Sequence, residues 1–166
     1  MNLQPLKLLW EHAWWAKAQL LPHVLALRTE EYARDLGSRF GSVQGTLAHL
    51  VGTEEIWLAR WCGSSPRALP AATDFPTPEV AARRWDAVEA GVRSLLGTLD
   101  AEGSGRLVTY RTTSGAEHRD PLWLLMLHVL HHSALYRGQL LALLRQLGLR
   151  ERVATDLVEY WRALHR

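Results

Sequence analysis

The stretch "MLHVLHHSALYRGQLL", Met126–Leu141, places three histidines within five positions of an otherwise leucine-rich run. Such a run predicts a helix that packs in the protein core. An imidazole buried there without a hydrogen-bond partner costs about 1–3 kcal/mol. We therefore expect another group to satisfy the ring nitrogens.

Three further stretches show the apolar spacing of three and four residues that is typical of long helices. Capping residues set their starts: Ser42 and Thr77 are N-caps, and Asp120 caps the helix that contains the histidines. The expected helices span Leu6–Leu27, 42–63, about 78–99 and 120–148, with Pro121 in the first turn of the last one.

The remaining segments predict connections. The segments 28–41 and 64–77 have the glycine or proline content of loops, and "RLVTYRTTSGAEHR", 106–119, predicts a short hairpin or an extended loop. The tail "TDLVEYWRALHR", 155–166, predicts a short C-terminal helix. The expected fold is therefore all-α, a four-helix bundle with this hairpin or loop before the fourth helix and a short helix at the end.

Length and composition limit the possible classes of protein. With 166 residues, 48% of them hydrophobic, the chain suits a single domain over 1–166. The net charge of +2 and the scattered arginines argue against a nucleic-acid partner. The single cysteine, Cys62, excludes an internal disulfide, and the sequence lacks a signal peptide or a membrane span, so we expect a cytoplasmic protein without a membrane partner.

The histidines form the candidate site. His128 and His132 are one helical turn apart and share a face, whereas His131 points away from it. His49 lies in the apolar stripe of the second expected helix, where a neighbouring helix would face it. Imidazoles that converge from two helices in a dry core suit Zn²⁺ or Ni²⁺ and leave a position open for water or substrate. The nearby Glu54 and Glu55 either orient a ligating imidazole or lie on a solvated face.

Three segments carry a family resemblance: "FGSVQGTLAHLVGTEEIWLARW", "HVLHHSALYRGQLLALLRQLG" and the closing "TDLVEYW". Over essentially its whole length the chain resembles the DinB (YfiT-like) superfamily of small four-helix-bundle metalloenzymes. The resemblance implies three metal-binding histidines, which map onto His49, His132 and position 136. In this sequence, position 136 is a tyrosine.

The tyrosine leaves three alternatives for the third ligand. Tyr136 ligates only as a phenolate, which requires the metal to lower a pKa that starts near 10. His128 supplies a third imidazole if the site lies about 5 Å, one helical turn, further along the helix. In the third alternative the site is lost. Of the first two we prefer His128.

Two classes of function follow. The resemblance implies a divalent-metal-dependent enzyme that acts on a small molecule, as a thiol transferase or by hydrolase-like chemistry, with a low-molecular-weight thiol as a partner. The alternative is a non-catalytic stress-response module that binds metal or another ligand. Tryptophan-rich helices and the habit of the family predict a homodimer. We interpret Cys62 as structural, His12 as a residue near the site or its entrance, and Arg137 as a residue that faces solvent or satisfies loop carbonyls.

Overall fold

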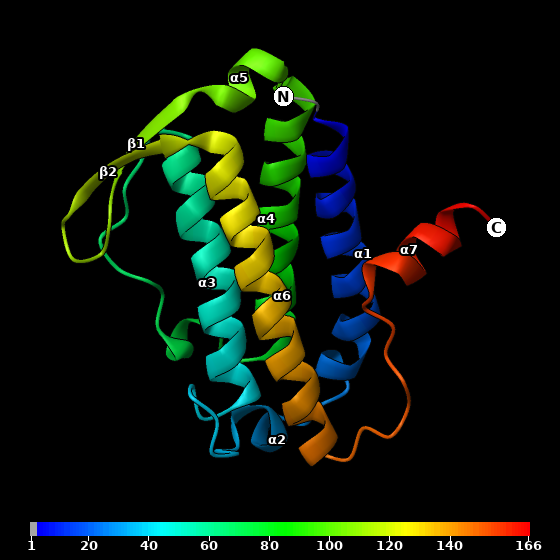
Figure 1. The fold of residues 1–166 in the computed structure, drawn as a ribbon. Coiled ribbons are helices and arrows are strands. Elements are labelled where there is room, and N and C mark those ends of the chain that lie inside the picture. Colours follow the sequence, from blue (N-terminus) through cyan, green and yellow to red (C-terminus); the bar gives the residue numbers. More distant parts are fainter. Residues whose placement is uncertain (1–2) are drawn as a thin grey trace.

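The computed structural model describes residues 3–166, which are mostly helical with one small sheet. The long helices α1 (Gln4–Leu25), α3 (Val43–Trp61), α4 (Pro78–Thr98) and α6 (Leu122–Gln146) lie side by side (Figure 1). Helix α3 contacts α4 and α6, and α1 contacts the same two helices from the other side. The four helices therefore enclose one core, and the expected all-α class is broadly confirmed.

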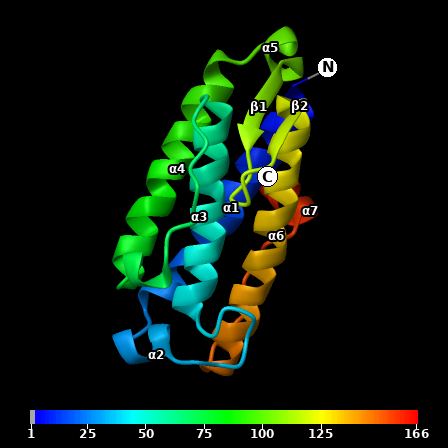
Figure 2. The same cartoon turned by 90° about the vertical axis from the view of Figure 1, so that its left-hand side faces the viewer.

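Short elements cover the two ends of the long helices. Figure 2 shows α2 (Thr29–Ala33) at one end and α5 (Ala101–Gly105) at the other. The antiparallel strands β1 (Leu107–Arg111) and β2 (Glu117–Pro121) follow α5, and the 3-10 helix η1 (Ala72–Asp74) lies between α3 and α4. The last helix, α7 (Leu157–Leu164), packs beside α1 (Figure 1). Within residues 3–166, no helix combines the length and the apolar character that a membrane crossing needs.

The core is made of large apolar side chains from all four long helices. Trp10 and Trp61 meet edge to face with ring centroids 6.0 Å apart, and both are almost completely buried. Full burial of such a side chain stabilises the fold by about 1.5–3 kcal/mol. The tryptophans of the first helix therefore serve mainly as core residues.

The capping signals are confirmed at two helices and wrong at a third. The side-chain oxygens of Ser42 and Thr77 accept hydrogen bonds from the N–H groups of Gly45 and Val80. Asp120 is not an N-cap, because it belongs to β2 and its carboxylate accepts a hydrogen bond from the Tyr110 hydroxyl at 3.1 Å. The hairpin is confirmed, extends through Pro121, and delays the start of α6 to Leu122.

Three short helices were not predicted. Helices α2 and η1 lie inside the two expected loops, and α5 lies between the third expected helix and the hairpin. Each has five residues or fewer, which is too short to produce a periodic apolar pattern in the sequence.

A glycine at the start of α3 allows the preceding loop to approach the helix closely. A Cβ atom added to Gly45 would lie 2.1 Å from the carbonyl oxygen of Phe40. Because that neighbour is backbone, a larger residue displaces the loop itself. Gly45 therefore determines where Phe40 lies against α3.

We expect Gly45→Ala to destabilise the fold by about 1–3 kcal/mol, through overpacking against the Phe40 backbone. The matched control is Gly138→Ala in the middle of α6, where an added Cβ has nothing within 4 Å. That change removes a flexible residue from a helix and should stabilise the fold by up to about 1 kcal/mol. Urea unfolding of both variants measures the two effects, and equal stability of both would contradict the close approach at Gly45.

Candidate metal centre

Two of the predicted site histidines meet between α3 and α6. The Nε2 atoms of His49 and His132 lie 3.1 Å apart, and the two ring centroids are separated by 5.0 Å. The two residues are 83 positions apart in the sequence, so the antiparallel packing of α3 on α6 creates this pair. The structure thus brings together the two imidazoles that the sequence placed on different helices.

Two further aromatic rings enclose the histidine pair. The Tyr136 ring lies one turn after His132, and its centroid is 4.5 Å from the ring centroids of both histidines. The Phe40 ring stacks on His49 at 4.2 Å and lies 5.6 Å from the Tyr136 ring, centroid to centroid. Phe40 was not predictable from the sequence, because its loop carries no periodic signal and its approach to α3 depends on the close contact at Gly45.

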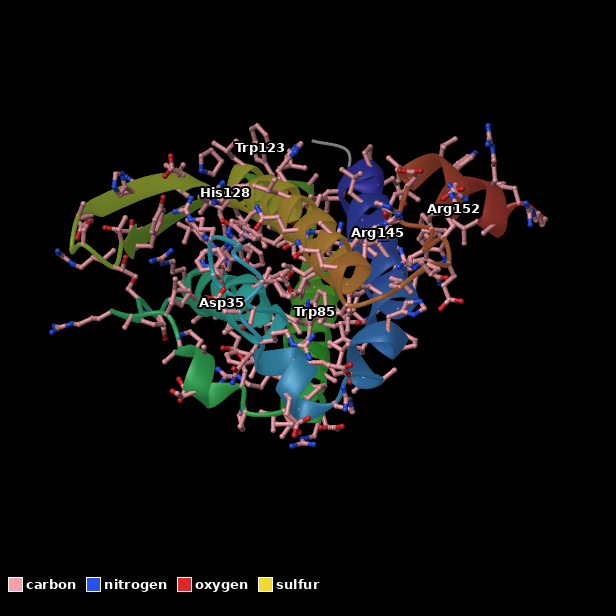
Figure 3. The ribbon with its side chains drawn as sticks, turned by 90° about the horizontal axis from the view of Figure 1, so that it is seen from below. Asp35, Trp85, Trp123, His128, Arg145 and Arg152 are labelled. Atoms are coloured by element: carbon pink, nitrogen blue, oxygen red, sulfur yellow. The ribbon has the colours of Figure 1, made fainter. Side chains whose placement is uncertain are left out.

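His128 is not part of this ring cluster. Its side chain is exposed on the first half of α6 (Figure 3), and its ring contacts Trp57 at 5.4 Å between centroids. The His128 and His132 ring centroids are 6.3 Å apart. Among residues 3–166, no three His, Cys, Asp or Glu side chains lie close enough together to hold one metal ion. Of the two candidates for the third ligand, Tyr136 and not the preferred His128 packs against both histidines.

Burial keeps the two histidines neutral at ordinary pH. It lowers the pKa of His132 to about 4, with smaller contributions from His49 and His128. Burial also lowers the pKa of His49, and the charge of Arg39 adds to this effect. Metal ligation needs neutral imidazoles, so these protonation states suit an ion, and they equally suit a direct N–H···N hydrogen bond.

Neither candidate glutamate hydrogen-bonds a histidine in the described part of the chain. Glu54 is completely buried, and its two carboxylate oxygens accept hydrogen bonds from the Ser133 hydroxyl at 2.6 Å and the Trp85 indole N–H at 2.9 Å. Burial raises the pKa of this carboxyl. Glu55 instead pairs with Arg84 at 2.6 Å. Glu54 therefore holds helices together. Among residues 3–166, the buried Nδ1 atom of His132 has no hydrogen-bond partner.

A cleft opens beside His49. It has a volume of about 260 Å³, and its lining includes Phe40, Ala48, His49, Leu69 and Pro70. The cleft gives a small, mostly apolar molecule access to the imidazole of His49. It is thus a route from solvent toward the histidine pair.

A comparison with protein families follows this geometry. The model of the DinB family matches residues 1–164. The chain belongs to the DinB family. A comparison with curated proteins finds none that matches it. In this DinB-family chain, the ring cluster of His49, His132 and Tyr136 occupies the three positions to which the resemblance assigns metal ligands.

Other residues singled out in the DinB-family sequence lie away from the histidine pair. The Nε2–H group of His12 donates a hydrogen bond to the carbonyl oxygen of Thr155 at 2.8 Å. Cys62 is exposed at the C-terminal end of α3. Arg137 was expected to face solvent or to hydrogen-bond loop carbonyls. It is instead buried within the helix packing, and in residues 3–166 no carbonyl accepts a hydrogen bond from it.

The lowered pKa of His132 predicts how stability depends on pH. Between about pH 6.5 and 4 the unfolded chain binds a proton at this residue that the folded protein excludes, so the free energy of unfolding falls as the pH is lowered through this window. His132→Asn should reduce the proton uptake on unfolding by up to about one proton. Chemical unfolding across the window, with a chelator present, measures this uptake.

His131→Asn, at the exposed neighbouring position, is the matched control and should keep the wild-type pH dependence. If His132→Asn and His131→Asn take up the same number of protons on unfolding, His132 is not the neutral group described above.

Proposed function

We propose that the chain is a divalent-metal-dependent enzyme that acts on a small molecule, with Zn²⁺ or Ni²⁺ held by His49 and His132 in the core of a four-helix bundle. The observation that carries this proposal is the 3.1 Å separation of the two Nε2 atoms. Two nitrogen ligands at about 2.0–2.1 Å from one ion lie roughly 2.9–3.4 Å apart when the angle between them is near 90–110°. The pair therefore fits two positions of one coordination sphere.

At the third position to which the resemblance assigns a metal ligand, the chain has the phenol of Tyr136. Tyr136 is buried, and its ring centroid lies 4.5 Å from the ring centroids of both imidazoles, so its phenol packs directly against the pair. We propose Tyr136, and not the exposed His128, as the third protein ligand. A phenolate adds one negative charge to two neutral imidazoles, which offsets part of the charge of a divalent ion in a dry site.

A bound ion of this kind supplies Lewis acidity and lowers the pKa of a bound water or thiol. The chain supplies the surroundings. The Phe40 ring covers one face of His49 and excludes water from it, while the adjoining cleft orients a small apolar group toward the pair. The resemblance implies thiol transfer or hydrolysis as the reaction class, with a low-molecular-weight thiol as the co-substrate.

One observation favours a second candidate, a non-catalytic stress-response module with a degenerate metal site. The two Nε2 atoms are also at hydrogen-bond distance, and no third His, Cys, Asp or Glu joins them in residues 3–166. In this case one imidazole donates to the other and the pair is a structural contact. The predicted homodimer is compatible with either candidate function.

Metal titration separates the two candidates. We expect the metal-free protein to bind about one Zn²⁺ or Ni²⁺ ion. His49→Ala and His132→Ala should each weaken the metal affinity at least about 100-fold, because loss of a metal ligand lowers the affinity at least as much as loss of a residue that hydrogen-bonds a ligand. Tyr136→Phe should weaken binding, and His128→Ala should leave it unchanged. Isothermal titration of an untagged protein measures all five affinities.

His131→Ala is the matched control for the loss of a histidine from α6. Stoichiometric binding that His49→Ala and His132→Ala leave intact would place the ion elsewhere. An absence of binding to the wild-type protein would favour the non-catalytic module.

A further inference from the structure

A second cavity lies on another face of α6. It has a volume of about 180 Å³, opens to solvent, and is lined by residues of α1, α6 and α7. Its lining residues on α6 recur at intervals of three and four, which places them on one face that does not include His132 or Tyr136. The cavity is lined by Leu9, His12, Leu127, Leu130, His131, Ala134, Arg137 and Leu157.

Arg137 is the buried charge of this cavity. Its side chain is only 5% exposed, and within residues 3–166 no hydrogen bond or ion pair reaches its guanidinium. A guanidinium has five N–H donors and is always charged at neutral pH. A buried charge without an acceptor is costly, which is why such groups are normally paired.

Glu54 does not fill this role. It is the acidic group whose charge acts on Arg137, but its two oxygens already accept hydrogen bonds from Ser133 and Trp85. Among the described residues, Glu54 acts on Arg137 only through its charge, without a hydrogen bond or an ion pair. The donors of Arg137 therefore stay available to an acceptor that enters the cavity.

His12 does not supply that acceptor either. Its Nε2 atom is bonded to the Thr155 carbonyl oxygen at 2.8 Å, which ties the segment before α7 to α1. The exposed His131 lies on the same face of α6 as Arg137. The rest of the lining is leucine and alanine, so the cavity offers one cation and an apolar wall.

We propose that this cavity binds a small carboxylate with an apolar body, whose carboxylate pairs with Arg137 and whose hydrocarbon part lies against the leucines. Planar carboxylates match the fork of a guanidinium and bind it through two parallel hydrogen bonds. A cavity of about 150 Å³ lined by apolar side chains accommodates benzene. The volume here therefore suits an acid of roughly benzoate size.

The probe is benzoate, titrated into the full chain and followed by the NMR signals of α6 or by thermal stabilisation. We expect saturable binding with a Kd of about 1 mM or tighter. Benzyl alcohol, which keeps the ring and lacks the charge, should bind at least about 10-fold more weakly. Arg137→Gln should weaken benzoate binding by a similar factor.

A second variant keeps the test valid if Arg137→Gln does not fold. Ala134→Phe fills the cavity from an exposed position of α6 and leaves Arg137 intact, so it should abolish benzoate binding. Ala142→Phe, also exposed on α6 but outside the cavity, is its matched control and should bind normally.

His49→Ala should also bind benzoate normally, because the histidine pair lies on another face of α6, and this result would stand whether or not the metal proposal holds. The proposal is overturned if the wild-type protein shows no binding at about 10 mM benzoate. It is equally overturned if benzyl alcohol binds as well as benzoate, or if Ala134→Phe binds like the wild-type protein.

Discussion

The hydrogen bonds of one buried carboxylate fix how the long helices sit against one another. Glu54 on α3 accepts from Trp85 on α4 and from Ser133 on α6, so it joins three of the four helices in the core. Apolar packing tolerates small sliding of helices, whereas these bonds require particular donor positions. Ser133 directly follows His132, and Glu54 lies little more than one turn after His49. The same contact therefore sets the level at which the two histidines meet.

The faces of helix α6 differ in chemistry. One face presents His132 and Tyr136 to α3, and another presents Arg137 and apolar side chains to α1 and α7. The three histidines of the leucine-rich run consequently have three different environments. His132 belongs to the half-buried histidine pair, His128 packs on Trp57 at the surface, and His131 borders the second cavity.

The sequence predicted what depends on periodicity and capping, and failed where tertiary contacts decide. The four long helices, the hairpin and the closing helix follow from apolar spacing and from caps such as Ser42. The prediction of Asp120 as an N-cap was wrong because Asp120 pairs with Val108 in the hairpin. His49 and His132 were predictable from their apolar stripes, but Phe40, the burial of Arg137 and the position of Tyr136 against both rings depend on helix register, which a single sequence does not reveal.

The central claim is that one ion joins His49 and His132 at a site without a third imidazole. X-ray absorption spectroscopy of the zinc-loaded protein tests it most directly. The account predicts two imidazole nitrogens and oxygen ligands at about 2.0–2.1 Å, with one oxygen contribution lost or replaced in Tyr136→Phe. A first shell with three imidazoles or with sulfur would contradict the account, as would a spectrum that is unchanged in His132→Ala.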